Sequence, residues 1–306
     1  MSAVVDAALA AAERTYKGET GLTTGLVDLD DRLGGLHPSE LVILAGRPGM
    51  GKSALALGIG RAVARSGKEV LIFSLEMSDE QLGARELAVA SGISAQDQRR
   101  AISHEQMDAL ISVAEEVAAL PVWIDDEPAT SAHLRARVMR HKRRRGGALD
   151  LVIVDYLQLV RSNARPENRV QEVSAIVREL KELAKELRAP VIVLSQLSRA
   201  LELRPDKRPL PADLRDSGEI EQVADTIIFV YREEYYVERT RPQLESFESD
   251  DKFAAAFQKY SDKLARAHGV AELIISKNRQ GGIGTVRVQF DAERIRFQNL
   301  TRRGDP

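Results

Sequence analysis

One short stretch of the chain combines glycines, a lysine and a serine in a spacing that suits phosphate binding: Gly46-Arg47-Pro48-Gly49-Met50-Gly51-Lys52-Ser53. Its glycines let backbone N–H groups close around phosphate oxygens at a helix N-terminus, where the helix dipole also favours an anion. Lys52 would then reach the β- and γ-phosphates, and the Ser53 hydroxyl would bind Mg²⁺. The stretch therefore predicts a nucleotide-binding loop that runs from Gly46 to Ser53.

The segments on either side of this loop have the strand and helix patterns that phosphate binding by a P-loop requires. The apolar run Leu41–Ala45 precedes it and is typical of a buried strand, and Ala54–Leu57 begins a helical pattern behind it. A G-x-x-x-x-G-K-[ST] motif works as a P-loop only between a strand and a helix. A chance Lys-Ser pair in a glycine-rich turn is the alternative, and this context disfavours it.

Polar side chains also lie at the ends of three other apolar runs. Asp155 ends the run at residues 151–155, Glu76 follows the run at 69–75, and Gln196 follows the run at 191–195. Because the carboxyl ends of neighbouring parallel strands face one crevice, we expect all three near the P-loop. Asp155 would hold Mg²⁺ through water, Glu76 would orient or deprotonate the attacking water, and Gln196 would sense the γ-phosphate. The alternatives are a turn-capping Asp155, an ordinary helix-start acid at Glu76 and a common strand-end amide at Gln196.

The wider pattern predicts an α/β fold with a mostly parallel sheet. Near-continuous apolar runs separated by helical stretches are typical of a parallel sheet that is covered on both faces. The predicted strands are Leu41–Gly46, Glu69–Leu75, Val122–Asp125, Leu151–Asp155, Val191–Ser195 and Thr226–Tyr231. Beyond them, Ala271–Lys277 and Gly284–Phe290 flank a glycine-rich tip and predict a C-terminal antiparallel hairpin.

Two irregular segments interrupt this order. The proline-containing segment Arg199–Gly218 predicts a loop without regular elements. In residues 238–269, aromatic residues at helical spacing behind Asp250 and Asp251 predict an inserted amphipathic helix. A local prop packed on the main domain is the plainer interpretation of that helix.

Composition narrows the function classes. The 306 residues contain no cysteine, which excludes disulfides, zinc–thiolate sites and thiol nucleophiles. The formal net charge of −2 gives no global basic field, so any nucleic-acid site must be local. The basic run Arg140–Arg145 is better explained as a solvated helix end. No apolar stretch has the length of a membrane span and no signal pattern begins the chain, so we expect a cytoplasmic protein with no membrane partner.

Several motifs, taken in order and spacing, resemble those of one known family. They are Gly46 to Ser53, the run from Phe73 to Ser78, the run from Asp155 to Leu159, the run from Ser195 to Arg199, the run from Asp213 to Gln222 and the run from Lys277 to Val286. Together they resemble the motor domain of the replicative DNA helicase of the DnaB type, over residues 22–300.

The resemblance implies a RecA-like P-loop NTPase fold and a homohexameric ring that binds ATP, or another NTP, and Mg²⁺ between its subunits. It divides the chain into a linker helix and connector at residues 1–20 and a motor domain at residues 21–306, with a helical insertion at 238–269. The separate N-terminal collar domain of this helicase type is not in the sequence, which puts primase contact in doubt.

The resemblance also assigns roles to individual residues. Lys52 and Ser53 serve the phosphates and Mg²⁺, Glu76 is the catalytic carboxylate, Asp155 is the metal-side acid and Gln196 is the γ-phosphate sensor. Lys277 and Arg279 lie on a hairpin that reaches the neighbouring subunit's site, with Arg279 as an arginine finger. An exposed hairpin cation is the alternative for Arg279.

For DNA, the resemblance implies a loop that carries Arg215, Asp216 and Gly218, lines the central channel and holds the single-strand backbone. An Arg215 that merely pairs with a neighbouring acid is the alternative. The expected function is an ATP-driven helicase that unwinds duplex DNA during replication, with single-stranded DNA and a helicase loader as partners. A RecA/RadA-like recombinase and a non-motor, ATP-gated DNA-binding or assembly module are the alternatives.

Overall fold

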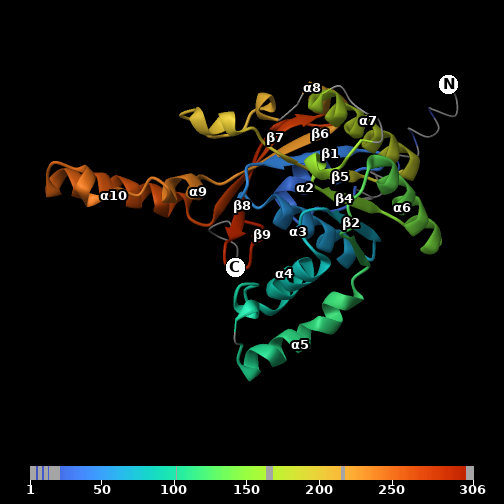
Figure 1. Cartoon of the computed structure of the whole chain (residues 1–306), viewed down its shortest axis with the longest axis horizontal. Coiled ribbons are helices and arrows are strands. Elements are labelled where there is room, and N and C mark those ends of the chain that lie inside the picture. The colour runs from blue at the N-terminus through green and yellow to red at the C-terminus, as the bar shows by residue number, and fades with distance from the viewer. Residues whose placement is uncertain are drawn as a thin grey trace.

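The computed structural model describes residues 21–100, 102–162, 168–214 and 218–300, together with Val5, Leu9 and Glu13. It contains a twisted sheet with the strand order β3-β2-β4-β5-β1-β6-β7-β8-β9 (Figure 1). The first six strands along the chain are parallel. They are β1 (Leu41–Gly46), β2 (Val70–Ser74), β3 (Val122–Asp125), β4 (Leu151–Asp155), β5 (Val191–Gln196) and β6 (Thr226–Tyr231).

The parallel strands are apolar because both faces of the sheet are covered. Every residue of β1, β2, β4 and β6 is buried. Along β1, Leu41 and Ile43 belong to one apolar cluster, whereas Val42 and Leu44 belong to the other. This alternation follows from the two-residue period of a strand, and it places a separate hydrophobic core on each side of the sheet.

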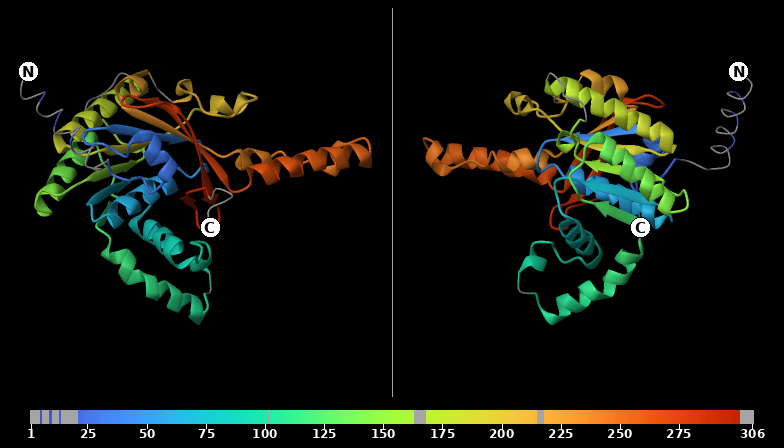
Figure 2. Two further views of the ribbon diagram at one scale, coloured as in Figure 1. Left: turned by 180° about the vertical axis from the view of Figure 1, so that it is seen from behind. Right: turned by 45° about the vertical axis from the view of Figure 1, so that its right-hand side comes forward.

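Helices from different parts of the chain form these two cores. On one side lie α2 (Val27–Leu33), α3 (Lys52–Arg65) and α4 (Asp79–Ser91). On the other side lie α6 (Ser131–Arg144), α7 (Arg169–Leu187) and α8 (Gly218–Val223). The other α-helices in the described ranges from residue 21 onward are α5 (His104–Ala119), α9 (Glu233–Glu238) and α10 (Asp250–Ala267). Figure 2 shows that α10 extends away from the sheet and that α5 lies outside α4.

Beyond β6 the sheet continues with antiparallel strands. These are β7 (Val270–Asn278), β8 (Gly284–Asp291) and β9 (Arg296–Gln298). Residues of β7 and β8 alternate between buried and more exposed positions, which is the pattern of a sheet with one covered face. The predicted parallel sheet, the helices on both faces and the C-terminal hairpin are therefore confirmed.

Some local predictions were wrong. The segment Arg199–Gly218 contains two short 3₁₀ helices, Arg199–Leu203 and Pro211–Asp213, rather than only loop. The Asp213 carboxylate accepts hydrogen bonds from the Leu210 N–H at 2.7 Å and from Arg204 at 2.9 Å, so side-chain acceptors order this proline-rich segment. The sequence patterns also did not predict α2 or β9.

The predicted inserted helix is present as α10, which begins behind the Ser249 cap. Among the described helices, none combines the length and apolarity that a bilayer crossing requires. Apart from Val5, Leu9 and Glu13, the predicted linker helix at residues 1–20 lies outside the described residues.

Candidate nucleotide site

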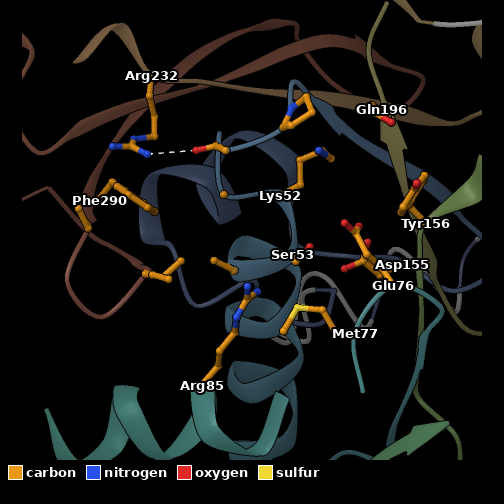
Figure 3. Close-up of a pocket in the computed structure, with 16 residues that line it drawn as sticks. Lys52, Ser53, Glu76, Met77, Arg85, Asp155, Tyr156, Gln196, Arg232 and Phe290 are labelled. Atoms are coloured by element: carbon orange, nitrogen blue, oxygen red, sulfur yellow. Dashed lines mark hydrogen bonds between the residues drawn. The ribbon is translucent and has the colours of Figure 1, made fainter. Parts of the chain in front are cut away.

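One pocket lies at the carboxyl edge of the parallel strands, against the start of α3 (Figure 3). The P-loop supplies part of its wall, and the ends of β2, β4, β5 and β6 supply more. Its lining residues are Pro48, Gly49, Gly51, Lys52, Ser53, Ala54, Glu76, Met77, Arg85, Asp155, Tyr156, Gln196, Arg232, Phe290, Ala292 and Ile295. The pocket therefore joins residues from most of the chain's length.

The P-loop needs glycine at two positions because of both backbone conformation and space. Gly49 and Gly51 have φ values of +82° and +95°, which L side chains rarely adopt. A Cβ atom at Gly49 would lie 2.8 Å from a ring carbon of Tyr235, and one at Gly51 would lie 2.9 Å from Phe297. Gly51 is also the residue before α3, so the P-loop places the N-terminus of this helix at the pocket.

Lys52 stands largely buried in this pocket. Burial lowers the pKa of its ammonium below the ordinary value, while the nearby Asp155 and Glu76 carboxylates act in the opposite direction. Its Nζ lies 3.5 Å from the Arg47 carbonyl oxygen, a long contact. A desolvated ammonium with weak protein partners is well suited to pair with phosphate oxygens.

The two carboxylates meet because their strands are neighbours. Ser74 of β2 is in register with Asp155 of β4, and the Leu75 N–H donates to the Asp155 carbonyl at 2.8 Å. Glu76 therefore leaves its strand beside Asp155 (Figure 3). Burial raises the pKa of Asp155 and the Glu76 charge adds to this, whereas a hydrogen bond from Ser53 lowers it.

Ser53 and Asp155 supply the hydroxyl and carboxylate oxygens that Mg²⁺ prefers. No cluster of three or more His, Cys, Asp or Glu ligands occurs among the described residues. The pair still fits Mg²⁺, because this ion commonly keeps several waters and takes only one or two protein carboxylates together with substrate phosphates.

Gln196 lies at the same edge, since β5 pairs with β1 and Gln196 is in register with Gly46. The Gln158 carboxamide oxygen accepts a hydrogen bond from the Gln196 N–H at 3.3 Å. The pocket thus brings together Lys52, Ser53, Glu76, Asp155 and Gln196, the residues that sequence reasoning placed on the phosphates, the metal and the attacking water.

Three P-loop residues do not line the pocket. Gly46 is the last residue of β1, and Met50 is buried, with 1% exposure, in the hydrophobic core. The Arg47 side chain is directed elsewhere: its Nε lies 2.9 Å from Glu202, and its Nη1 donates to the Leu197 carbonyl at 3.0 Å. Arg47 therefore braces the P-loop against the segment after β5.

The structure does not bring Lys277 or Arg279 into the pocket of their own chain. Asn278 is in register with Thr226, the first residue of β6, so the end of β7 lies at the opposite sheet edge. Arg279 contacts Asp225 at 3.3 Å and donates to the Gln222 carbonyl, and Lys277 donates to the Glu221 carbonyl. Burial and the Arg279 charge lower the pKa of Lys277.

Two arginines of the pocket were missed. Arg85 enters it from α4, and burial lowers its pKa although Asp155 and Glu76 favour the charged form. Arg232 follows β6 and faces the P-loop (Figure 3). Arg85 carries no local signal, because an arginine on an amphipathic helix is usually solvent-facing. The signal at Arg232 was its place directly after a predicted strand.

Of the predicted DNA contacts, Arg215 and Asp216 lie outside the described residues. Gly218 is the first residue of α8, and among the described residues outside its own helix turn none lies within 4 Å of a Cβ built there.

Comparison with known proteins identifies the family. The family described as "DnaB-like helicase C terminal domain" matches residues 21–299. The chain belongs to this family. It is 45% identical over 293 residues to "Replicative DNA helicase DnaB" of Rickettsia bellii, covering 92% of this chain and 58% of that protein. It is 40% identical over 294 residues to "Replicative DNA helicase DnaC" of Bacillus subtilis, covering 94% and 59%. The chain thus spans a little over half the length of these curated relatives.

Solved structures agree with this assignment. A solved ATPase domain superposes on this chain with a TM-score of 0.83 at 32% identity, covering 97% of this chain and 99% of that one. A structure of a DnaB-like replicative helicase and its interactions with primase gives 0.78 at 34% identity, covering 92% and 64%. The RecA-like fold expected from the motifs is therefore confirmed.

Replacing Lys52 by alanine should weaken nucleotide binding itself. A charge-assisted contact to phosphate contributes roughly 1.5–3 kcal/mol, so we expect at least about a tenfold loss of ATP affinity. Calorimetric titration of Lys52→Ala with MgATP measures this, with the exposed α10 variant Lys259→Ala as the matched control. Equal affinity of Lys52→Ala and the parent would refute the P-loop assignment.

Proposed function

We propose that this chain is an ATP-hydrolysing DNA helicase motor that moves along single-stranded DNA and separates the duplex during replication. The observation that carries the proposal is that the candidate catalytic residues lie in two separate places on the chain. Lys52, Ser53, Glu76, Asp155 and Gln196 share one pocket, whereas Lys277 and Arg279 lie at the opposite edge of the sheet.

Within the pocket each residue has a distinct task. Lys52 binds the β- and γ-phosphates as a point charge, and Ser53 and Asp155 hold Mg²⁺, which when bound offsets phosphate charge. Glu76 orients the attacking water and accepts its proton. Gln196 and Arg85 lie beside these groups, where an amide and a guanidinium can contact the γ-phosphate.

The remaining charge comes from a second copy of the chain. A guanidinium on a rigid two-stranded arm can stabilise the charge that accumulates in the transition state. Because Arg279 is remote from its own pocket, it serves the pocket of the next subunit. Repetition of this contact around a closed ring gives the homohexamer.

Single-stranded DNA binds at the loop that carries Arg215, Asp216 and Gly218. Contacts from one arginine and from backbone amides at a glycine suit sequence-independent recognition of phosphates. The ring repeats this small patch, so a chain with a formal net charge of −2 can still bind a polyanion.

The cellular setting of the motor is part of the same proposal. The motor works in the cytoplasm with a helicase loader as partner. Contact with primase is a proposal as well; the solved relative described with primase is matched over 64% of its length.

Arg215→Ala should weaken single-strand binding about equally for all base sequences. Loss of one phosphate contact should also lower the salt dependence by about one charge per site. Fluorescence titration of labelled single strands at several salt concentrations measures both quantities. Arg143→Ala, in the exposed basic run of α6, is the matched control. Unchanged affinity and salt slope for Arg215→Ala would rule this loop out, whereas a loss confined to Arg143→Ala would place the DNA on α6.

The proposal is tested against its alternatives by ATP hydrolysis with and without single-stranded DNA. A helicase motor hydrolyses ATP faster when the strand is bound and remains a closed ring by native mass measurement. Filaments that pair homologous strands would favour the recombinase. Nucleotide binding without turnover would favour an ATP-gated assembly module.

A further inference from the structure

Arg232 is a buried guanidinium in the wall of the nucleotide pocket. It follows β6 directly and is 8% exposed. Its Cζ lies 3.9 Å from the centre of the Phe290 ring, and its Nη1 donates to the Gly49 carbonyl at 3.2 Å (Figure 3). Its Nε is buried and has no hydrogen-bond partner among the described residues. A buried charge with an unsatisfied donor lowers the stability of the fold. We therefore expect a function of Arg232 beside the P-loop.

The contact with Gly49 bears on the shape of the P-loop. An anion site built from backbone N–H groups is disturbed by a carbonyl oxygen that faces the anion. The hydrogen bond from Arg232 engages the Gly49 carbonyl oxygen and so disfavours a rotation of this oxygen toward a bound anion. Tyr235 also lies against Gly49, so the segment from Arg232 to Tyr235 forms the surface on which the P-loop packs.

Glu234 links Arg232 to neighbouring residues behind the P-loop. It is 5% exposed, and its carboxylate lies 3.3 Å from Arg232 Nη2. The same carboxylate lies 2.6 Å from His268 Nδ1 and accepts the Gly269 N–H at 3.3 Å. Glu234 therefore connects the start of α9 to the junction between α10 and β7, and so both ends of the α9–α10 segment are fixed behind the P-loop.

We propose that Arg232 is a positioning residue for the phosphate-binding loop, and that Glu234 fixes its guanidinium in place. The pair sets the loop for the diphosphate that nucleoside di- and triphosphates share. This inference rests on the proposed nucleotide-binding function and adds a determinant of affinity to it.

The position of Arg232 decides which kinetic parameter it controls. Figure 3 shows Arg232 and Phe290 on one side of the P-loop and Glu76, Asp155 and Gln196 on the other. Loss of Arg232 should therefore weaken binding of the ground state and of the transition state alike. Such a loss raises KM and leaves kcat nearly intact.

The test uses variants that separate positioning from folding. Arg232→Lys keeps the charge but lacks the planar fork that reaches Gly49 and Glu234 together. The double variant Arg232→Met/Glu234→Gln removes both charges, so no buried ion is left without a partner. Arg266→Lys, on the exposed face of α10, is the matched control, and Lys52→Ala reports on the site itself.

We expect both Arg232 variants to bind MgADP and MgATP about tenfold more weakly by calorimetry, because a loop that has lost the charge-assisted hydrogen bond at Gly49 must be ordered again when the nucleotide binds, at a comparable cost in free energy. Their KM should rise in parallel while kcat falls by less than about threefold. Parental affinity in a double variant with a parental melting temperature would overturn the inference. A fall in kcat at unchanged affinity would overturn it as well.

The Lys52→Ala variant shows whether a negative result refutes only the positioning role of Arg232 or the proposed nucleotide site as well. If Lys52→Ala loses nucleotide and the Arg232 variants do not, only the positioning role is wrong. If Lys52→Ala also binds nucleotide normally, the nucleotide site and the role of Arg232 fall together.

Discussion

Arg279→Ala and Lys52→Ala proteins, each inactive alone, should regain partial ATP hydrolysis when they are mixed into one ring. Some interfaces then join an intact Lys52 pocket to an intact Arg279 donor. The Arg279 side chain of the described chain contacts Asp225, at the sheet edge remote from its own pocket. Because an arginine finger contributes about 10³-fold or more to the rate, modest complementation stands well above background.

The measurement is the steady-state rate of mixed rings whose hexameric mass is verified by native mass spectrometry. Arg287→Ala, an exposed arginine on β8 of the same hairpin, is the matched control and should behave as the parent. A rate no higher than the sum of the two mutant proteins would defeat the trans role of Arg279. It would leave Arg279 as a structural partner of Asp225.

Glu76→Gln should retain nucleotide binding while hydrolysis falls by about a hundredfold or more. The amide preserves the shape of the side chain, but it cannot accept a proton from water. Glu76 lies beside Asp155 because β2 and β4 are neighbours in register. Single-turnover hydrolysis of radiolabelled ATP, together with ADP affinity, separates the chemical step from binding.

Glu80→Gln, an exposed carboxylate in the first turn of α4, provides the control for charge removal near the site. Turnover of Glu76→Gln within a few-fold of the parent would reduce Glu76 to a helix-start acid. A parallel loss of nucleotide binding would instead show that Glu76 supports the pocket rather than the chemistry.

Much of the fold could be predicted because its signals are local. The apolar strands are bounded by loops with clear breakers, and both faces of the sheet are covered, so their continuous apolar runs stand out. Asp155 and Glu76 could be placed together because parallel strands end at one edge. The helix α2 was missed because its N-cap, Leu26, makes no side-chain cap hydrogen bond and gives no start signal.

The partners of charged side chains could not be predicted in the same way. Arg47 belongs to the P-loop motif, yet its side chain pairs with Glu202, which lies 155 positions away. Arg232 reaches Gly49 across 183 positions and is held by a Glu234 that also binds His268. Such pairings depend on how β5, β6 and the P-loop pack in space, and the local sequence carries no pattern for them.

Unwinding of a forked DNA duplex by the assembled protein tests the central claim most directly. The account predicts ATP- and Mg²⁺-dependent release of one strand, measured by loss of energy transfer between labelled strands. Neither Glu76→Gln nor Arg279→Ala should release it. Single-strand-stimulated ATP hydrolysis without strand release by closed rings would contradict a helicase motor, and would instead favour an ATP-gated DNA-binding module.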